Sequence, residues 1–167
     1  TWIADETIDF LETRDETRPF FLWSSFTKPH PPFDPCRDFW DLYDGIPLPA
    51  PVTGDWSETV EDTPQGFLAG AYENTNMHLL GKEQRLASRR AYYACITQID
   101  YQLGRIFGAL RELDLLKNTW VIFTSDHGEM LGDHHMSQKN LFFEGSAHVP
   151  LLIMPPQGRQ LPHNCVV

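Results

Sequence analysis

The sequence lacks three features, each of which would indicate a particular class of protein. It has no apolar run near the ~20 residues that a membrane span needs, no cluster of Lys and Arg, and no CxxC pair. Its three cysteines stand far apart, at positions 36, 95 and 165, which argues against a zinc site or a disulfide framework and favours reduced thiols. With 13 basic and 23 acidic residues, the net charge is −10, so nucleic acid is not an expected partner.

The first residues also lack the basic leader and the apolar core of a secretion signal. We therefore expect a soluble protein without a membrane partner, and the sequence does not decide between cytoplasm and periplasm. The 167 residues are 41% hydrophobic, enough to bury a core, and neither a linker nor an internal repeat divides them. Residues 1–167 are expected to form one domain or a large piece of one.

The apolar pattern predicts an α/β fold. The expected elements are two helices, over about 5–14 and 83–116, and three buried strands, over 20–26, 120–123 and 149–154. The second helix has the clearest period, with apolar residues at three- and four-residue steps from Ile96 to Leu113. Because a strand, a crossover helix and a second strand form a βαβ unit, parallel pairing of the first two strands is expected.

Between the first strand and the long helix, residues 33–82 are irregular and rich in Pro, Gly, Asp and aromatic residues. A structureless loop of this length is unusual inside a compact domain. It indicates either a functional insertion that forms one wall of a substrate cleft or a surface embellishment.

Residues suited to chemistry follow two of the expected strands. Asp126 and His127 come directly after the strand 120–123 and offer a carboxylate oxygen and an imidazole nitrogen to a divalent cation, while Gly128 permits a sharp turn. The alternative is a polar loop whose histidines are only solvated. After the strand 20–26, a proline-rich segment holds Lys28 and His30 in defined directions.

These segments together resemble the sulfatase branch of the alkaline phosphatase-like superfamily. The similarity rests on Ser-Asp-His-Gly-Glu at 125–129, Leu-Gly-Asp-His at 131–134, a Lys four residues beyond His135, and Val-Pro-Leu-Leu-Ile at 149–153. Upstream, Pro-Phe-Phe-Leu at 19–22, Lys-Pro-His-Pro-Pro-Phe at 28–33 and Tyr-Tyr-Ala at 92–94 match that family in the same order. The resemblance implies an alkaline phosphatase-like fold, with a mainly parallel sheet flanked by helices.

The resemblance also implies roles for five residues. Asp126 and His127 would be ligands of a divalent metal, usually calcium, with magnesium or manganese as alternatives. Lys139 would contact the sulfate, with Lys28 as a second substrate-binding residue unless its side chain points to solvent, and His30 would protonate the leaving oxygen. A metal ion and an ammonium group stabilise the charge on the ester oxygens, and an imidazole titrates near working pH.

The departures from the family are equally informative. Sulfatases attack with a formylglycine made within a C/S-x-P-x-R segment, and this sequence contains none. The pattern also lacks the strand that carries two further acidic metal ligands in the family. The C-terminal subdomain of the family is missing from it as well. We therefore expect an internal fragment, a partial catalytic domain that lacks its nucleophile and is inactive alone, with formylglycine in the missing N-terminal part. An incomplete sheet exposes an edge, which predicts a homo-oligomer.

Three functions remain open at this point. The first is hydrolysis of a small-molecule sulfate ester. The second is hydrolysis of a phosphonate monoester or phosphodiester by an enzyme of the same superfamily, since the ester preference depends on residues outside these motifs. The third is a non-catalytic remnant that serves as an interaction module.

Overall fold

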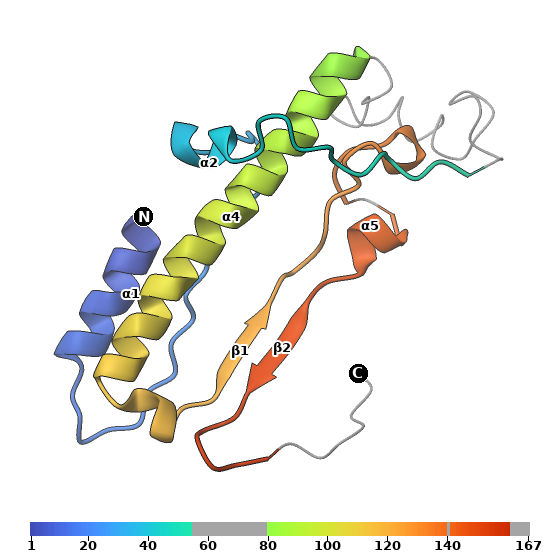
Figure 1. The fold of residues 1–167 in the computed structure, drawn as a ribbon. Helices are drawn as coiled ribbons and strands as arrows, with labels where there is room; N and C mark the ends of the chain where they lie inside the picture. Colours follow the sequence, from blue (N-terminus) through green and yellow to red (C-terminus); the bar gives the residue numbers. More distant parts are fainter. Residues whose placement is uncertain (55–79, 140, 161–167) are drawn as a thin grey trace.

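The computed structural model describes residues 1–54, 80–139 and 141–160. Along the chain, these residues form α1 (Trp2–Thr13), α2 (Arg37–Asp41), α4 (Lys82–Glu112), the 3-10 turn η4 (Leu115–Lys117), β1 (Val121–Thr124), the 3-10 turn η5 (Asp133–His135), α5 (Glu144–Ala147) and β2 (Leu151–Met154). Figure 1 shows the long α4 helix between α1 and α2 on one side and the two strands on the other. The expected α/β class is confirmed.

Both expected helices are present. α1 begins at Trp2, three residues before the expected start, and α4 covers nearly the whole of the expected 83–116 segment. The two helices pack together through Ala4 and Leu11 of α1 and Ile106 and Leu110 of α4. Burying each of the larger side chains contributes about 2 kcal/mol. This contact fixes α1 against the C-terminal half of α4 (Figure 1).

The two strands pair differently from the expected arrangement. β1 and β2 are antiparallel, with Ile122 opposite Ile153, and form the only sheet within the described residues. The expected parallel partner, residues 20–26, pairs with neither strand. Its side chains alternate instead: Phe20, Leu22 and Phe26 pack against the α1–α4 core, and Phe21, Trp23 and Ser25 are exposed. The βαβ pairing is therefore wrong for the described part of the chain, because the segment packs through one face and forms no ladder there.

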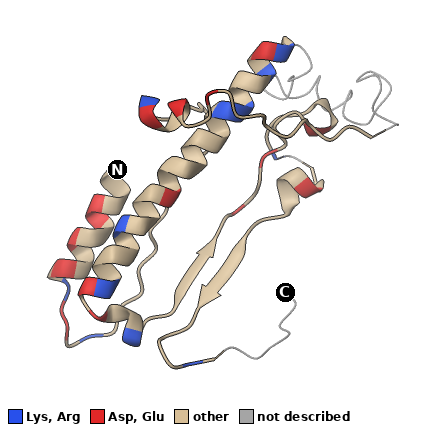
Figure 2. Ribbon diagram, viewed as in Figure 1, with Lys and Arg blue, Asp and Glu red and all other residues tan. Residues whose placement is uncertain are grey.

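The strands are also less buried than expected. Ile122 is 61% exposed and Leu152 is 64% exposed. Neither strand contains a charged residue (Figure 2), and this composition led us to expect burial, although a strand is buried only where another layer covers it. An uncovered apolar strand favours association, so the homo-oligomer stays a prediction.

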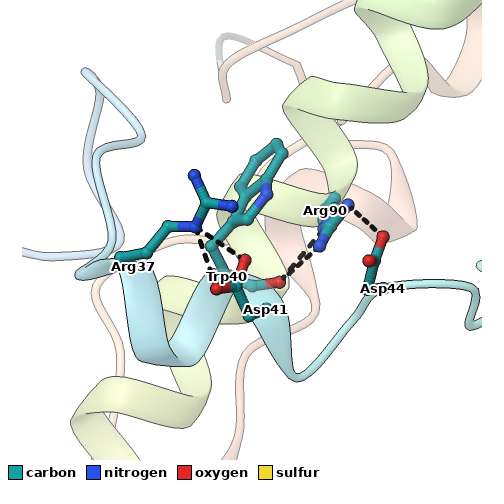
Figure 3. A network of polar contacts seen from close by, with 5 residues as sticks. All are labelled: Arg37, Trp40, Asp41, Asp44 and Arg90. Atoms are coloured by element: carbon teal, nitrogen blue, oxygen red, sulfur yellow. Dashed lines mark hydrogen bonds and ion pairs between the residues drawn. The ribbon is translucent and has the colours of Figure 1, made fainter.

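Residues 33–54 are partly ordered, contrary to the expectation of an irregular insertion. Arg90 of α4 lies against the C-terminal end of α2 (Figure 3): Nε and Nη2 donate to the Trp40 carbonyl at 3.1 and 2.9 Å, and the guanidinium lies 4.3 Å from the centre of the Trp40 ring. Arg90 also pairs with Asp44 at 3.1 Å. A cation at a helix C-terminus stabilises carbonyls that lack a helical partner, so Arg90 holds α2 on α4. Residues 55–79 of the expected insertion lie outside the described residues.

α4 is the longest helix, with 31 residues, and Figure 2 shows Lys, Arg, Asp and Glu at intervals along it. If α4 spanned a membrane, these charges would have to enter the hydrocarbon of the bilayer. Among the described residues, no helix combines the length and the apolar composition that a membrane span requires.

Candidate functional site

The loop that follows β1, residues 125–139, contains the proposed metal ligands and Lys139. Local hydrogen bonds fix its first residues: the Ser125 hydroxyl donates to the His127 carbonyl at 2.8 Å, and the His127 N–H donates to Asp126 Oδ1 at 3.0 Å. Asp126 thereby folds its carboxylate back toward the next residue. The carboxylate and the imidazole of adjacent residues consequently lie on the same side of the chain.

The His127 ring is oriented by its own neighbour. Its Nδ1 lies 2.7 Å from the Gly128 carbonyl, and because a carbonyl oxygen only accepts, Nδ1 must carry the proton. In the neutral ring, Nε2 then has a free electron pair, and it lies 3.5 Å from Asp126 Oδ2. Two electron donors that face each other at this separation suit one shared cation, and a backbone carbonyl on the other ring nitrogen is the usual support of a histidine ligand.

Asp126 and His127 provide only two ligands for a cation, and their surroundings affect the charge of Asp126. Within the described part of the chain, no three His, Cys, Asp or Glu side chains gather into a group that could hold a metal ion, and this includes the surroundings of Asp126 and His127. Slight burial tends to raise the pKa of Asp126, but hydrogen bonds from its backbone and the nearby His127 outweigh this and lower the pKa below the ordinary value. Asp126 is therefore ionised at neutral pH, as a metal ligand must be.

Gly128 places the 125–139 loop directly on α5. Its N–H donates to the Ser146 carbonyl at 2.7 Å, and a Cβ atom at position 128 would lie 2.2 Å from the Gly145 carbonyl oxygen. No side chain fits there, so the position next to His127 requires glycine. The short α5 helix is consequently part of the wall that holds the proposed metal ligands.

Glu129 organises the rest of the loop, a role that the sequence pattern did not predict. Its carboxylate accepts the backbone N–H groups of Leu131, at 3.4 Å, and of Gln138. Burial raises the pKa of Glu129, and this effect outweighs the opposing effects of those N–H groups and of the nearby Lys139 and His127. The carboxylate thus closes the loop between positions 129 and 138, and His127 and Lys139 both lie within its electrostatic reach.

Lys139 is held in the loop through its backbone. The Ser146 hydroxyl, which is buried, donates to the Lys139 carbonyl at 2.7 Å. Among the residues that the structure describes, the Lys139 ammonium group forms no ion pair. A lysine whose backbone is fixed, and whose ammonium group forms no ion pair within the described residues, is suited to binding an anionic group.

His30 and Lys28 lie in a second loop, residues 27–34. His30 is exposed, and its Nδ1 donates to the Pro31 carbonyl at 2.8 Å, which leaves Nε2 accessible. The Lys28 ammonium donates to the Pro32 carbonyl at 2.6 Å and pairs with Asp34, whose pKa it lowers. The side chain of Lys28 thus folds onto its own loop, whereas the other nitrogen of His30 remains available.

α4 connects the two loops. Burial, with the nearby Glu129 charge, raises the pKa of Tyr92 to about 12, and the ring of Phe33 meets the Tyr92 ring edge-on at 5.3 Å. One turn further along, burial raises the pKa of Cys95, while the Lys28 charge opposes that shift. The helix turn 92–95 therefore contacts the 27–34 loop through Tyr92 and lies within the electrostatic reach of Glu129 in the 125–139 loop. Within the described residues, no hydrogen bond or ion pair joins His30 directly to Asp126, His127 or Lys139.

The remaining histidines of the 125–139 loop shape the chain. His134 and His135 have left-handed backbones, with φ of 50° and 65°, and the His134 ring packs against Phe143 at 4.6 Å. Asp133 accepts the Val52 N–H at 2.9 Å, and His134 donates its own N–H to the Val52 carbonyl at 2.8 Å. Part of the 33–82 segment is thus attached to the candidate site.

Comparison with known proteins identifies the family of the chain. Residues 2–163 match the sequence model of the Sulfatase family. The chain is 41% identical over 155 residues to an arylsulfatase of Clostridium perfringens (strain 13 / Type A), covering 93% of this chain and 31% of the relative. It is 38% identical to a choline-sulfatase of Rhizobium meliloti (strain 1021), covering 87% of this chain and 28% of that relative.

A solved structure confirms the fold. The phosphonate monoester hydrolase of Agrobacterium radiobacter superposes with a TM-score of 0.76 and 36% sequence identity, over 93% of this chain and 32% of that one. The chain therefore has an alkaline phosphatase-like fold and spans about a third of the length of the proteins it matches. The family match extends over nearly the whole chain, and the chain belongs to the sulfatase family.

Proposed function

We propose that the whole protein containing this chain hydrolyses sulfuric esters with the help of a divalent cation. The observation that supports this most directly is the facing pair of Asp126 Oδ2 and His127 Nε2, 3.5 Å apart, in a member of the sulfatase family. We propose calcium as the cation, with magnesium or manganese as alternatives. When bound, such a cation supplies positive charge that stabilises the developing charge on the ester oxygens.

The residues of the two loops divide the remaining tasks. Lys139 would bind the sulfate oxygens through its ammonium group. His30 would protonate the leaving oxygen from Nε2, because the Pro31 carbonyl already holds Nδ1. Contact of Lys28 with the substrate stays a prediction, and it would require the ammonium group to share or exchange Asp34.

The 167 residues supply only part of such a site. Calcium takes roughly six to eight oxygen ligands, so Asp126 and His127 need further ligands from other parts of the protein or from water. The sequence also contains no C/S-x-P-x-R segment, so we propose that the nucleophile, a formylglycine, comes from outside these residues. The chain alone is accordingly proposed to be inactive, and the tests below use the whole protein.

A second candidate is hydrolysis of phosphonate monoesters or phosphodiesters. The structural similarity to the phosphonate monoester hydrolase of Agrobacterium radiobacter, with a TM-score of 0.76, favours it. Sulfate and phosphonate esters both present anionic oxygens to a cation and an ammonium group, so the described residues accommodate either.

A substrate panel separates the candidates. We expect the purified whole protein to hydrolyse an aryl sulfate with at least roughly tenfold higher kcat/KM than a phosphonate monoester or a phosphodiester with the same aryl leaving group, a difference of about 1.4 kcal/mol in transition-state stabilisation. The measurement is initial rates of release of the aryl alcohol. The reverse order of rates would support the second candidate, and no turnover of any ester would support a non-catalytic module.

A further inference from the structure

Arg89 is the one arginine of α4 that is almost completely buried in the described part of the chain. The residue is 7% exposed, and its Nε is buried without a hydrogen-bond partner among the described residues. Removing a guanidinium group from water carries a large desolvation cost unless its contacts compensate. The contacts of Arg89 therefore need an explanation.

Those contacts lie in the middle of the 125–139 loop. Arg89 Nη1 donates to the Leu131 carbonyl at 2.7 Å and lies 3.9 Å from Asp133 Oδ1. Leu131 has a left-handed backbone with φ of 46°, a conformation that non-glycine residues adopt only at a cost. Asp133 in turn accepts the Val52 N–H. The buried guanidinium group of Arg89 thus holds the carbonyl of Leu131, whose backbone is left-handed, and the carboxylate of Asp133, which binds Val52 of the 33–82 segment.

The position of these contacts relates Arg89 to the candidate site. Asp126 and His127 lie on one side of Leu131 in the loop, and Lys139 lies on the other. Glu129 already ties the two halves of the loop together through the N–H groups of Leu131 and Gln138. Arg89 binds the carbonyl of the same Leu131 and thereby fixes this loop to the rigid α4 helix.

Arg90 provides a natural contrast. Consecutive residues of a helix point about 100° apart, because one turn holds about 3.6 residues. Arg90 accordingly contacts Trp40 and Asp44 at α2 (Figure 3), while Arg89 faces the 125–139 loop. The two arginines have the same charge and helix, but only Arg89 contacts the candidate site loop.

We propose that Arg89 is a positioning residue for the hydrolytic site, which holds Leu131 and Asp133 so that Asp126, His127 and Lys139 keep their mutual placement. The inference rests on the proposed function. It does not require Arg89 to touch the substrate. Displacement of a charged group by about 1 Å in an active site can lower the rate by about 100-fold, so a support of this kind affects turnover strongly.

The test compares Arg89→Met, Arg89→Lys and Arg90→Met in the whole protein. We expect Arg89→Met to lower kcat for the best ester about 30-fold with a smaller change in KM, because misplaced groups lose transition-state contacts first. Arg89→Lys should recover part of that loss, since an ammonium group can still donate to the Leu131 carbonyl. Arg90→Met should change kcat less than about threefold, because its contacts lie at α2.

Two further measurements separate positioning from folding. Circular dichroism gives the folded fraction of each variant, and rates are expressed per folded molecule. Calorimetric titration with calcium, magnesium or manganese should show about tenfold weaker affinity for Arg89→Met, the size expected when a support of metal ligands is lost.

Wild-type kcat and cation affinity per folded molecule in Arg89→Met would overturn the inference, and so would equal losses in Arg89→Met and Arg90→Met. If Arg89→Met does not fold, the same comparison with Arg89→Lys decides. A wild-type protein that hydrolyses no ester would refute the proposed function instead. The cation affinities of the variants would then still decide the role of Arg89.

Discussion

Gly128→Ala should destabilise the whole protein by about 3 kcal/mol and displace the 125–139 loop. The added Cβ would lie 2.2 Å from the Gly145 carbonyl oxygen, and the hydrogen bond from the Gly128 N–H to the Ser146 carbonyl would have to stretch or break. The contact is with backbone atoms, so no side chain can rotate away. We expect denaturant unfolding to show the loss of stability and the aryl sulfate assay to show a loss of activity, because His127 is the preceding residue.

Gly104→Ala is the matched control for this prediction. Gly104 lies on the exposed side of α4, and a Cβ there would meet no atom within 4 Å. Alanine is a better helix former than glycine, so this variant should be more stable by up to about 1 kcal/mol, the opposite sign from Gly128→Ala. Equal free energies of unfolding for wild type and Gly128→Ala would show that the loop does not approach α5 as closely as described.

The parts of the fold that local sequence determines were predictable. α1 and α4 follow from apolar residues at helical spacing, and both were found within a few residues of their expected bounds. Strand partners depend on contacts between distant parts of the chain, and the prediction of a parallel pair involving residues 20–26 was wrong for that reason. The burial of β1 and β2 was also wrong, because composition does not tell whether a neighbouring layer covers a strand.

In the candidate site too, local motifs were predictable from the sequence, and contacts between separate parts of the chain were not. Asp126, His127, Lys139, His30 and Lys28 were identified from motifs, and the structure describes all five. Glu129 and Arg89 were missed, because their roles arise from contacts with residues far along the chain: Glu129 accepts an N–H from position 138, and Arg89 donates to position 131. The available signals were a carboxylate inside the Ser-Asp-His-Gly-Glu string and an arginine at a helix position that faces inward.

Asp126→Asn should lower kcat/KM for the aryl sulfate by at least about 100-fold and weaken the divalent cation strongly. The amide keeps the size of the side chain and can still accept the His127 N–H, so the change removes mainly the negative charge that faces His127 Nε2 at 3.5 Å. Asp9→Asn, an exposed carboxylate on α1, makes the same substitution away from the 125–139 loop and should leave both quantities unchanged.

The dependence of activity on the divalent cation tests whether the lower kcat/KM of Asp126→Asn comes from the proposed metal site or only from the removal of a negative charge. Treatment with a chelator should lower wild-type activity to about the level of Asp126→Asn, and adding calcium back should restore the wild type fully but the variant only at much higher concentration. The measurement is initial rate against free cation concentration for wild type, Asp126→Asn and Asp9→Asn. Wild-type activity that survives complete chelation, or an Asp126→Asn curve that coincides with the wild-type curve, would mean that Asp126 and His127 face each other for a reason other than a shared cation.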